Sequence, residues 1–561
     1  MNLSESGEPG TLDLRLSTQL APREIRTAVA VGRAPRLAVL FTTVAGFGLL
    51  ANVLGYLREI ALAASYGSSG ITDAFFGAAF IPNTLYAIIA TGAGAAVLVP
   101  VLVQYREKSD AEARELALTL LNLTTLVLVV LTLVLTLTSP FWIRLLFPGF
   151  APGTRRLSVE LAYILNPTVI FLSVSALLAG VLNAFGRFSS VAVAPCVGNV
   201  VTVAAICLSV NWGGIRGAAL GVAAGALVQL VVMSWMTFSK TVPYKVHLRM
   251  GHAGLRRFAG MAAPTIAYLA VAYTSLTAER IFASGFGPGA LSTLSYAMRL
   301  FVLPAAIVAG SFATVLHTEF SILASRKELH RLSERFRRGV DLTIFMLIPV
   351  SIGALVFRHA LVALAYGYGK FSGENVGMTA STFAAYSLGI LPLALGTLCQ
   401  RLFYAFRVPR MLLIIECVAL VAYLITAPIL GRLFGIPGLA LARSCSFLIV
   451  GGLSLAVALR KLTSARLGVS LLSQFGRCAI SALPATLLWI ALAIQLDRLE
   501  PGTARWERLL VLAFAGVVGS VLYLFTARIL RCRGADDAIR ETAGRLVGAA
   551  GWMGLMKRFA S

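Results

Sequence analysis

Charged residues are scarce in this sequence. They make up 13% of its 561 residues, and only 24 of them are Asp or Glu. A water-soluble protein needs more polar surface than this, because solvated groups must cover its apolar core. Apolar residues make up 58% of the chain, and its mean hydropathy is +0.84. The composition therefore excludes a soluble protein and predicts one that faces lipid.

Catalytic and metal-binding motifs are also missing. The seven cysteines are scattered, without a CxxC pair or a His/Cys cluster, so neither a disulfide framework nor a metal site is predicted. No HExxH, P-loop or serine-elbow motif occurs. We therefore predict no catalytic residues, no cofactor and no enzymatic activity. The net charge of +24 does not indicate a nucleic-acid partner, because the basic residues lie in short loops between apolar runs.

Long apolar runs recur along nearly the whole chain. About 30 Å of hydrocarbon is crossed by roughly twenty helical residues, and runs of this length exceed what a barrel strand needs. Two connections, 141–156 and 359–371, are long enough for amphipathic surface segments. The predicted fold is an all-α integral membrane protein with about 14 transmembrane helices, at residues 37–65, 72–104, 114–138, 158–183, 190–211, 215–238, 256–284, 290–322, 339–357, 378–404, 410–430, 436–459, 475–496 and 507–528.

The distribution of basic residues predicts the orientation. With the N-terminus inside, roughly 33 Lys and Arg residues fall in cytoplasmic segments, about 10 outside and about 5 within spans. Both termini are therefore predicted to be cytoplasmic. Residues 1–35 lack the apolar segment of a cleavable signal and are expected to form a disordered cytoplasmic tail, with a second cytoplasmic tail at 531–561.

An internal repeat divides the chain into two halves. Gly214-Ile-Arg-Gly-Ala-Ala-Leu220 returns as Gly435-Ile-Pro-Gly-Leu-Ala-Leu441, Asn183-Ala-Phe185 as Tyr404-Ala-Phe406, and Cys196-Val197 as Cys417-Val418, each 221 residues later. Six spans per copy give both copies the same orientation, so the two lobes form a parallel pseudo-repeat, a transporter design with its substrate site between the lobes. We predict an N-lobe at 36–240, a C-lobe at 241–462 and an additional pair of helices at 463–530.

Arginines within the predicted spans mark a candidate site. Burying a charge in a membrane costs about 2.5–3.5 kcal/mol on insertion scales, so such residues usually face a bundle interior or a water-filled cavity. Arg58, Arg280 and Arg299 could converge in a central cavity and bind phosphate through charge-assisted forks. Alternatively, each pairs with a nearby acid or extends to the headgroups. Arg58 and Glu59 point about 100° apart on a helix, so they are not expected to pair with each other.

Acidic residues in the spans allow other roles. Glu416 and Glu279 are candidates for coupling transport to an ion, although membrane-buried acids are often structural. Asp73 lies near the start of a predicted span, where it either belongs to the substrate site or complements the positive end of a helix.

Several motifs are specific enough to compare with known proteins. They are Val53-Leu-Gly-Tyr-Leu-Arg-Glu59, Thr72-Asp-Ala-Phe-Phe76, Ile81-Pro-Asn83, Gly92 and Val99-Pro100, with Ala297-Met-Arg-Leu300 in the eighth helix. Together they resemble the MurJ (MviN) family, over roughly residues 37–530. The resemblance implies a flippase of the bacterial cytoplasmic (inner) membrane, from the multidrug/oligosaccharidyl-lipid/polysaccharide exporter superfamily. Such a protein moves lipid II, a polyprenyl-pyrophosphate-linked peptidoglycan precursor, to the outer leaflet by alternating access.

The same resemblance implies roles for individual residues and partners. Arg58, Arg299 and Arg280 would hold the pyrophosphate, with Asp73 and Asn52 in the same site. The last two helices would form a groove for the lipid tail. The implied partners are the lipid-linked glycan and membrane lipids, with the cell-wall synthesis machinery as a further candidate. Either a coupling ion (sodium or proton) or the membrane potential would drive transport.

The chain departs from the family at several positions. The family usually has Arg where this chain has Asn52, an Arg pair and then Glu where it has Tyr86, Ala87 and Thr91, and Asp where it has Met298. Three alternatives therefore stay open. They are a flippase for another lipid-linked oligosaccharide (an exopolysaccharide or O-antigen unit), an ion-coupled exporter of small molecules, and a scaffold of cell-wall assembly that does not transport.

Overall fold

The computed structural model describes residues 34–245, 249, 251–371, 373–406, 408–462, 465–498 and 505–535. These residues are nearly all helical and none of them lies in a strand, which confirms the all-α prediction for this part of the chain. The two predicted tails lie outside the described residues, apart from 34–35 and 531–535.

The N-lobe is a set of long apolar helices joined by short connections. An apolar segment in lipid forms a helix because its backbone groups must find partners within the segment, and proline or glycine stands at several of the helix starts. The helices are α3 (Ala34–Tyr66), α4 (Gly70–Ile89), η1 (Ala90–Leu98), α5 (Val99–Arg106), α6 (Asp110–Leu137), α7 (Ser139–Leu146), α8 (Pro152–Leu165), α9 (Thr168–Ala184), α10 (Phe188–Ser209) and α11 (Gly214–Lys240).

The C-lobe repeats this arrangement. The starts of α8 and α16 are 221 residues apart, and so are those of α10 and α18, which is the offset of the sequence repeat. The parallel pseudo-repeat is therefore visible in the helix boundaries. The C-lobe helices are α12 (Ala253–Ala283), η2 (Ser284–Phe286), α13 (Ala290–Ser325), α14 (Leu329–Val356), α15 (Arg358–Tyr366), α16 (Gly373–Ser387), α17 (Ile390–Ala405), α18 (Pro409–Phe434) and α19 (Ile436–Lys461).

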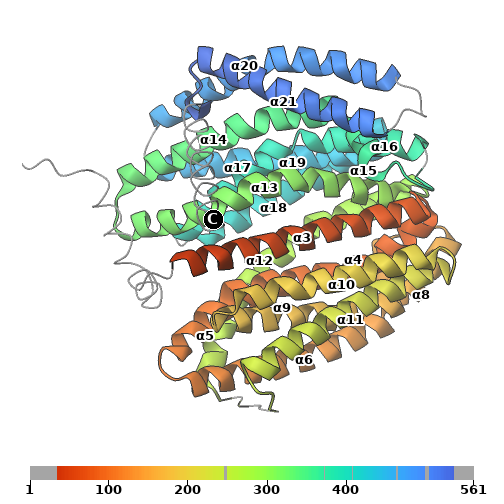
Figure 1. Ribbon diagram of the computed structural model, residues 1–561, viewed down its shortest axis with the longest axis vertical. Coiled ribbons are helices and arrows are strands. Elements are labelled where there is room, and N and C mark those ends of the chain that lie inside the picture. Colours follow the sequence, from red (N-terminus) through yellow and green to blue (C-terminus); the bar gives the residue numbers. More distant parts are fainter. Residues whose placement is uncertain are drawn as a thin grey trace, which may run out of the picture.

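Two further helices have no counterpart in the repeat. They are α20 (Ala465–Arg498), which packs on α14, and α21 (Arg505–Ile529), which packs on α20 and α15. In Figure 1 the N-lobe helices (orange to yellow) lie below and the C-lobe helices (green to cyan) above, with α20 and α21 (blue) at the top. Among the described helices, the additional pair thus packs against the C-lobe.

The number of spans agrees closely with the prediction. Twelve of the described segments are long and apolar enough to cross a membrane, and the bent pair α16 and α17 makes a thirteenth. Helix α13 occupies the place of the remaining predicted span, and its part Ala290–Pro304 is a shorter apolar helix. The predicted surface segments contain the short helices α7 and α15.

Three spans predicted as continuous helices are broken in the structure. The span predicted over 72–104 changes from α4 to the π-helical segment η1, in which Gly94 leaves helical geometry with ψ of −122°. Pro167 follows the end of α8 and precedes α9, and α16 meets α17 at 44° next to Gly389. Proline lacks the N–H that a helix interior needs, and glycine tolerates unusual backbone angles, so helices bend at such residues.

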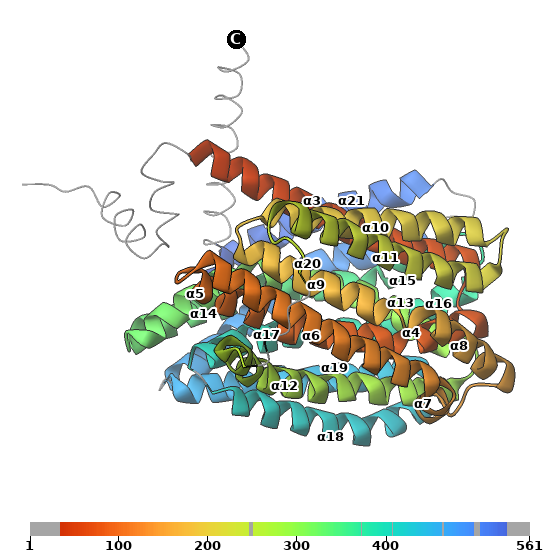
Figure 2. The ribbon, with the colours of Figure 1, turned by 90° about the horizontal axis from the view of Figure 1, so that it is seen from below.

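Helix α12 connects the two lobes. Near its start, Arg249 pairs with Glu115 of α6 at 3.0 Å, and Ile266 packs where a side chain at Gly92 of η1 would lie. Its later part packs on α18 and α19, and just beyond its end Ser284 Oγ accepts a hydrogen bond of 3.3 Å from Gly149 N of the N-lobe. Figure 2 shows α12 between α6 of the N-lobe and α18 of the C-lobe. The helix therefore lies between the lobes and contacts both of them.

Candidate functional site

Hydrogen bonds join the lobes at one end of the bundle, which we call the sealed end. It contains the end of α3 and the starts of α4 and α13. Asp73, buried on α4, accepts bonds of 2.7 Å from the backbone N–H groups of Gly289 and Ser292 at the start of α13. A carboxylate there satisfies donors that the helix leaves unpaired, and it complements the positive end of the helix. Asp73 therefore joins the lobes and binds backbone rather than an arginine.

The backbones of the two lobes also approach each other closely at the sealed end. Lys370 N donates to the carbonyl oxygen of Ala64 at 2.8 Å, and Ser68 Oγ donates to that of Gly289 at 2.8 Å. Gly369 has φ of +55°, and a Cβ there would lie 2.2 Å from the Ala64 carbonyl oxygen. Only glycine fits this position, because any side chain would push the lobes apart.

Arg58 lies on α3, eight residues before the end of that helix. Its Nη2 atom is 2.8 Å from Glu59 Oε1, so the expectation that these neighbours do not pair is wrong. Both side chains are long enough to bend toward each other even though their Cβ atoms point apart. The pair lines a cavity of about 50 Å³ inside the N-lobe, together with Phe76, Asn83 and Thr168 among others.

Arg299 lies on α13, nine residues after the start of that helix and thus at nearly the depth of Arg58. Its side chain is exposed and lies over the ring of Tyr56, with Cζ 5.7 Å from the ring centroid. Tyr56 Oη donates to the Arg299 carbonyl oxygen at 2.5 Å. No ion pair between Arg299 and an acid is seen in the described part of the chain, so its charge is available to a ligand.

Arg280 lies on α12, three residues before the end of that helix. Its Nη1 atom donates to Ser295 Oγ at 2.6 Å and to the Leu291 carbonyl oxygen at 3.3 Å. Ser295 and Leu291 precede Arg299 by one and two helical turns on α13, so Arg280 contacts the face of α13 that carries Arg299, at a position closer to the sealed end. Within the residues that the structure describes, Arg280 also lacks an acidic partner.

Three further side chains at this place have no charge and were not singled out from the sequence. Tyr56 and Ser295 contact the arginines, and Asn199 of α10 donates to the Ala51 carbonyl oxygen at 3.1 Å beside them. Tyr56 lies within the motif Val53–Glu59, so the sequence could have indicated it. Asn199 and Ser295 belong to none of the motifs described above, so nothing in the sequence pointed to them. Asn52 lies one turn before Tyr56 on α3 and is exposed.

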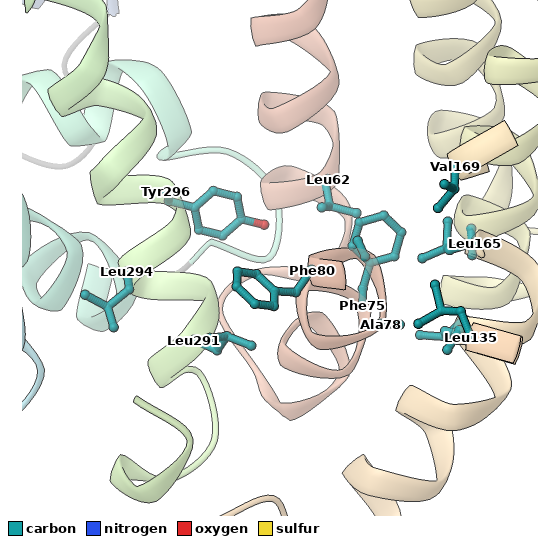
Figure 3. Packing of buried hydrophobic residues seen from close by; sticks show 14 of the residues in the cluster. Leu62, Phe75, Ala78, Phe80, Leu135, Leu165, Val169, Leu291, Leu294 and Tyr296 are labelled. Carbon is teal, nitrogen blue, oxygen red and sulfur yellow. The ribbon is translucent and has the colours of Figure 1, made fainter. Parts of the chain in front are cut away.

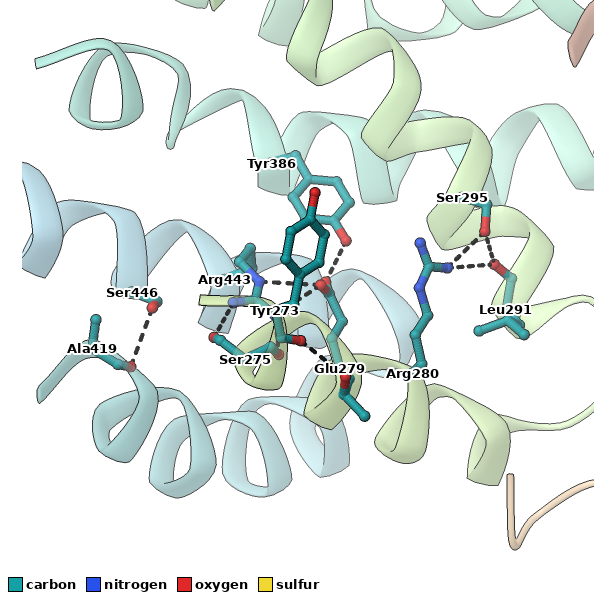
Figure 4. Close-up of polar contacts among 11 residues, drawn as sticks. Tyr273, Ser275, Glu279, Arg280, Leu291, Ser295, Tyr386, Ala419, Arg443 and Ser446 are labelled. Atoms are coloured by element: carbon teal, nitrogen blue, oxygen red, sulfur yellow. Dashed lines mark hydrogen bonds and ion pairs between the residues drawn. The ribbon is translucent and has the colours of Figure 1, made fainter. Parts of the chain in front are cut away.

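Glu279 points away from Arg280 and into the C-lobe. Its Oε2 atom receives two bonds from Arg443 of α19, at 3.0 and 3.1 Å, and its Oε1 atom accepts from the hydroxyl of Tyr386. Arg443 also donates to Ser275, and it lies 4.2 Å from the ring centroid of Tyr423. Figure 4 shows Glu279 directed toward Arg443 and Tyr386, and Arg280 directed toward Ser295. Both carboxylate oxygens of Glu279 are therefore already occupied.

Glu416 lies on α18 in the same lobe. It interacts electrostatically with Arg443 and with the hydroxyl of Tyr268. Tyr268 in turn accepts a hydrogen bond of 3.0 Å from Gln400. Both acids thus interact with one arginine, and among the described residues the ion pair of Arg443 is with Glu279.

An apolar groove of about 570 Å³ runs between the additional helices and the C-lobe. Its walls come from α14 and α15 on one side and from α20 and α21 on the other. The residues that line it are Phe345, Met346, Pro349, Val350, Gly353, Ala354, Phe357, Leu361, Trp489, Leu512, Gly516, Ser520, Tyr523 and Leu524. Such a lining accommodates a hydrocarbon chain.

Known proteins similar to this chain share one description. A family model described as lipid II flippase MurJ matches residues 62–506. The lipid II flippase MurJ of Burkholderia cenocepacia is 27% identical over 376 residues, which are 65% of this chain and 72% of that protein. The probable lipid II flippase MurJ of Bdellovibrio bacteriovorus is 24% identical over 494 residues, 86% of this chain and 93% of the relative.

Solved structures agree at the level of the fold. A lipid II flippase MurJ in an inward closed conformation matches with a TM-score of 0.71 and 22% identity, over 88% of this chain and 98% of that one. An inward-facing multidrug resistance transporter of the MATE family and the MOP superfamily matches with a TM-score of 0.64 and 14% identity, over 74% and 94% of the two chains. The overall fold is therefore shared with these proteins.

Proposed function

The chain belongs to the MurJ family of lipid II flippases, and on that basis we propose that it carries lipid II across the bilayer by exposing a site between its lobes to each side in turn. The family, the multi-pass architecture and the arginine-lined site all agree with this function. They favour it over an exporter of small molecules, which shares only the fold.

One observation carries the assignment of the site. Arg280 contacts α13 one turn before Arg299, and neither arginine has an acidic partner among the described residues, although an unpaired charge at membrane depth is costly. A pyrophosphate offers several negative oxygens to such guanidinium groups and forms short, charge-assisted bonds with them. The two arginines therefore form the part of the proposed pyrophosphate site that the C-lobe contributes.

Arg58 would complete that site from the opposite lobe. Its present partner is Glu59, so the charge of Arg58 is neutralised in the absence of cargo. An incoming pyrophosphate competes with Glu59 for the guanidinium, because it is the stronger multidentate acceptor. Binding would thus exchange an internal ion pair for one with the substrate, beside the contact that Tyr56 of α3 already makes with α13.

We assign the sealed end to the outer face of the membrane. The charge distribution of the loops supports this orientation, with both termini cytoplasmic. The described state then exposes its site toward the cytoplasm, and outward opening requires the bonds of Asp73, Ser68 and Lys370 across the lobes to break. A cargo drives that change only by binding the two states with different affinity.

The groove beside α20 and α21 is the proposed path of the polyprenyl tail. A tail there would stay in an apolar environment while the headgroup crosses between the lobes. Glu416 is our proposed coupling residue, since the carboxylate of Glu279 is occupied by Arg443 and Tyr386.

Filling the groove should slow transport. A Cβ at Gly516 meets nothing within 4 Å, so Gly516→Phe places its ring in the groove without a backbone clash. We expect about tenfold slower flipping of lipid II in proteoliposomes, because obstructing an apolar site costs roughly 1–3 kcal/mol. Gly452→Phe on α19 is the matched control, since that glycine also has open space and does not line the groove. Equal rates for the two variants would contradict the assignment.

Replacing the coupling residue should change the ion dependence of transport and not the binding of cargo. Glu416→Gln keeps the size and polarity of the side chain and removes its charge. We expect transport by this variant to become independent of sodium and proton gradients, and Glu279→Gln to retain the dependence of the wild type if it folds. Flipping rates measured with a sodium gradient and with a proton gradient, each imposed separately, show which of Glu416 and Glu279 couples transport to an ion. A gradient dependence that survives in Glu416→Gln would exclude Glu416.

Reconstitution tests the proposed function itself. Purified protein in vesicles should translocate fluorescent lipid II, and a strain depleted of its own lipid II flippase should grow when it expresses this chain. Translocation of a polyprenyl-pyrophosphate O-antigen unit in the absence of lipid II transport would instead favour the other class of lipid-linked glycan. No headgroup-dependent translocation at all would overturn the proposal.

A further inference from the structure

The small cavity beside Arg58 is a side pocket of the proposed site. Its volume is about 50 Å³, and its walls come from α3, α4, α8, α9, α10 and α11, all in the N-lobe. Asn83, which lines it, is exposed, whereas Thr168 on another wall is buried. The pocket therefore reaches from an accessible surface into the lobe.

The lining of this pocket has two chemical characters. Its polar groups are Arg58, Glu59, Asn83 and Thr168. The rest of the wall is apolar: Leu62, Phe75, Phe76, Ala79, Pro82, Leu165, Ile206 and Val222. Figure 3 shows Leu62, Phe75 and Leu165 converging on one space. A group that fits must combine an apolar part with a few hydrogen-bonding atoms.

The volume of the pocket limits which chemical groups can bind in it. A water-sized group needs about 10–15 Å³, so the pocket has room for about four non-hydrogen atoms. A phosphoryl group would set charged oxygens against the apolar wall, which costs free energy. A sugar hydroxyl would leave that wall uncovered. An acetamido group has four such atoms, with a methyl at one end and an amide at the other.

We propose that the pocket binds the acetamido group on the sugar attached directly to the pyrophosphate, which makes the substrate class 2-acetamido-2-deoxyhexosyl pyrophosphates. In such a sugar the phosphate is on C1 and the acetamido group on C2, so the two groups are neighbours. Arg58 lines the pocket and also belongs to the proposed pyrophosphate site, so the two sites are neighbours in the protein as well. This inference rests on the proposed function and adds the means by which the cargo's first sugar is recognised.

The hydrogen-bonding capacity of the lining matches an amide. Thr168 Oγ1 donates its proton to the Leu165 carbonyl oxygen at 2.6 Å, so it is left with acceptor capacity toward a ligand. An acetamido N–H supplies the matching donor. Asn83 and Arg58 carry N–H donors for the acetamido carbonyl oxygen.

A matched pair of cargoes tests the pocket. Polyprenyl-pyrophosphoryl N-acetylglucosamine and polyprenyl-pyrophosphoryl glucose differ only in the group on C2. For the wild-type chain in proteoliposomes we expect about a tenfold preference for the acetylated cargo, from one buried methyl group and one amide hydrogen bond. Ala79→Val fills the pocket and should reduce the preference to about one, mainly by slowing the acetylated cargo. Ala79→Gly leaves the pocket open and should keep the preference.

Thr168→Val provides a second variant of similar volume, which removes the acceptor and should also lower the preference. Transport of the glucose cargo reports in each case whether the protein is folded. Equal rates for the two cargoes in the wild type would overturn the acetamido assignment, and so would an unchanged preference in Ala79→Val. Lipid II is the reference cargo in the same vesicles. If the wild type moved lipid II and neither of the two monosaccharide cargoes, the acetamido assignment would fail while the proposed function would stand, and if it moved none of the three, the proposed function itself would fail.

Discussion

Arg299→Ala is expected to slow lipid II flipping by roughly 10- to 100-fold. The side chain is exposed at the site and has no acidic partner in the described chain, so it contributes little to folding and its charge is free for the cargo. Losing charge-assisted bonds to a pyrophosphate costs about 1.5–3 kcal/mol, which corresponds to this range. Initial rates in proteoliposomes measure the effect, with thermal melting of the purified variant as the check on folding.

Matched variants make this test specific. Arg432→Ala removes an exposed arginine near the end of α18, away from the site, and should leave the rate unchanged. Arg299→Lys keeps the charge and loses the planar fork, so it should give an intermediate rate. A rate for Arg299→Ala within twofold of the wild type would remove Arg299 from the pyrophosphate site.

The fold was largely predictable because membrane insertion leaves few alternatives. Twenty apolar residues in lipid must satisfy their own backbone groups, so hydropathy predicts each helix. The breaks at Gly94 and Gly389 were not predictable in the same way, since glycine is common in membrane helices that stay straight. Which glycine bends a helix depends on the neighbours that pack against it.

The site was less predictable, because the partners of each charge lie far away in the sequence. Arg443 is 164 residues from Glu279, and Ser292 is 219 residues from Asp73. Spacing along one helix gave no information on these pairs, and it gave the wrong answer for Arg58 and Glu59. Hydropathy placed the arginines within apolar helices but could not show which of them lack an acidic partner.

The resemblance to the family implies charged residues at the positions of Asn52 and Met298, and both positions lie within a turn of the contact between Tyr56 and Arg299. Arg280 binds Ser295, one turn before Arg299, and adds a positive charge to the same helix face. A site that keeps its cationic character with different residues can still bind the same pyrophosphate.

Arg443→Ala should destabilise the protein by about 3–5 kcal/mol. The Arg443 and Glu279 side chains are only 5% and 1% exposed, so the variant would leave a carboxylate buried without its counter-charge. The backbone carbonyl and hydroxyl of Ser275 would also lose their donors. Thermal melting of the detergent-purified protein should show a marked decrease, and flipping should fall because α12 loses its attachment to α19.

Two further variants show whether the loss of stability in Arg443→Ala comes from the unpaired Glu279 carboxylate or from the lost contacts of Arg443. Arg216→Ala removes a second Arg–Glu pair, at 2.6 Å from Glu160, but its side chains are 62% and 35% exposed. Exposed pairs contribute about 0–1 kcal/mol, so this variant should melt almost like the wild type. The double variant Glu279→Leu/Arg443→Met removes both charges and should be more stable than Arg443→Ala alone, since apolar replacements of buried ion pairs are often close to neutral. If the double variant were no more stable than Arg443→Ala, the cost would come from lost contacts of Arg443 with Ser275 and Tyr423 rather than from the unpaired carboxylate.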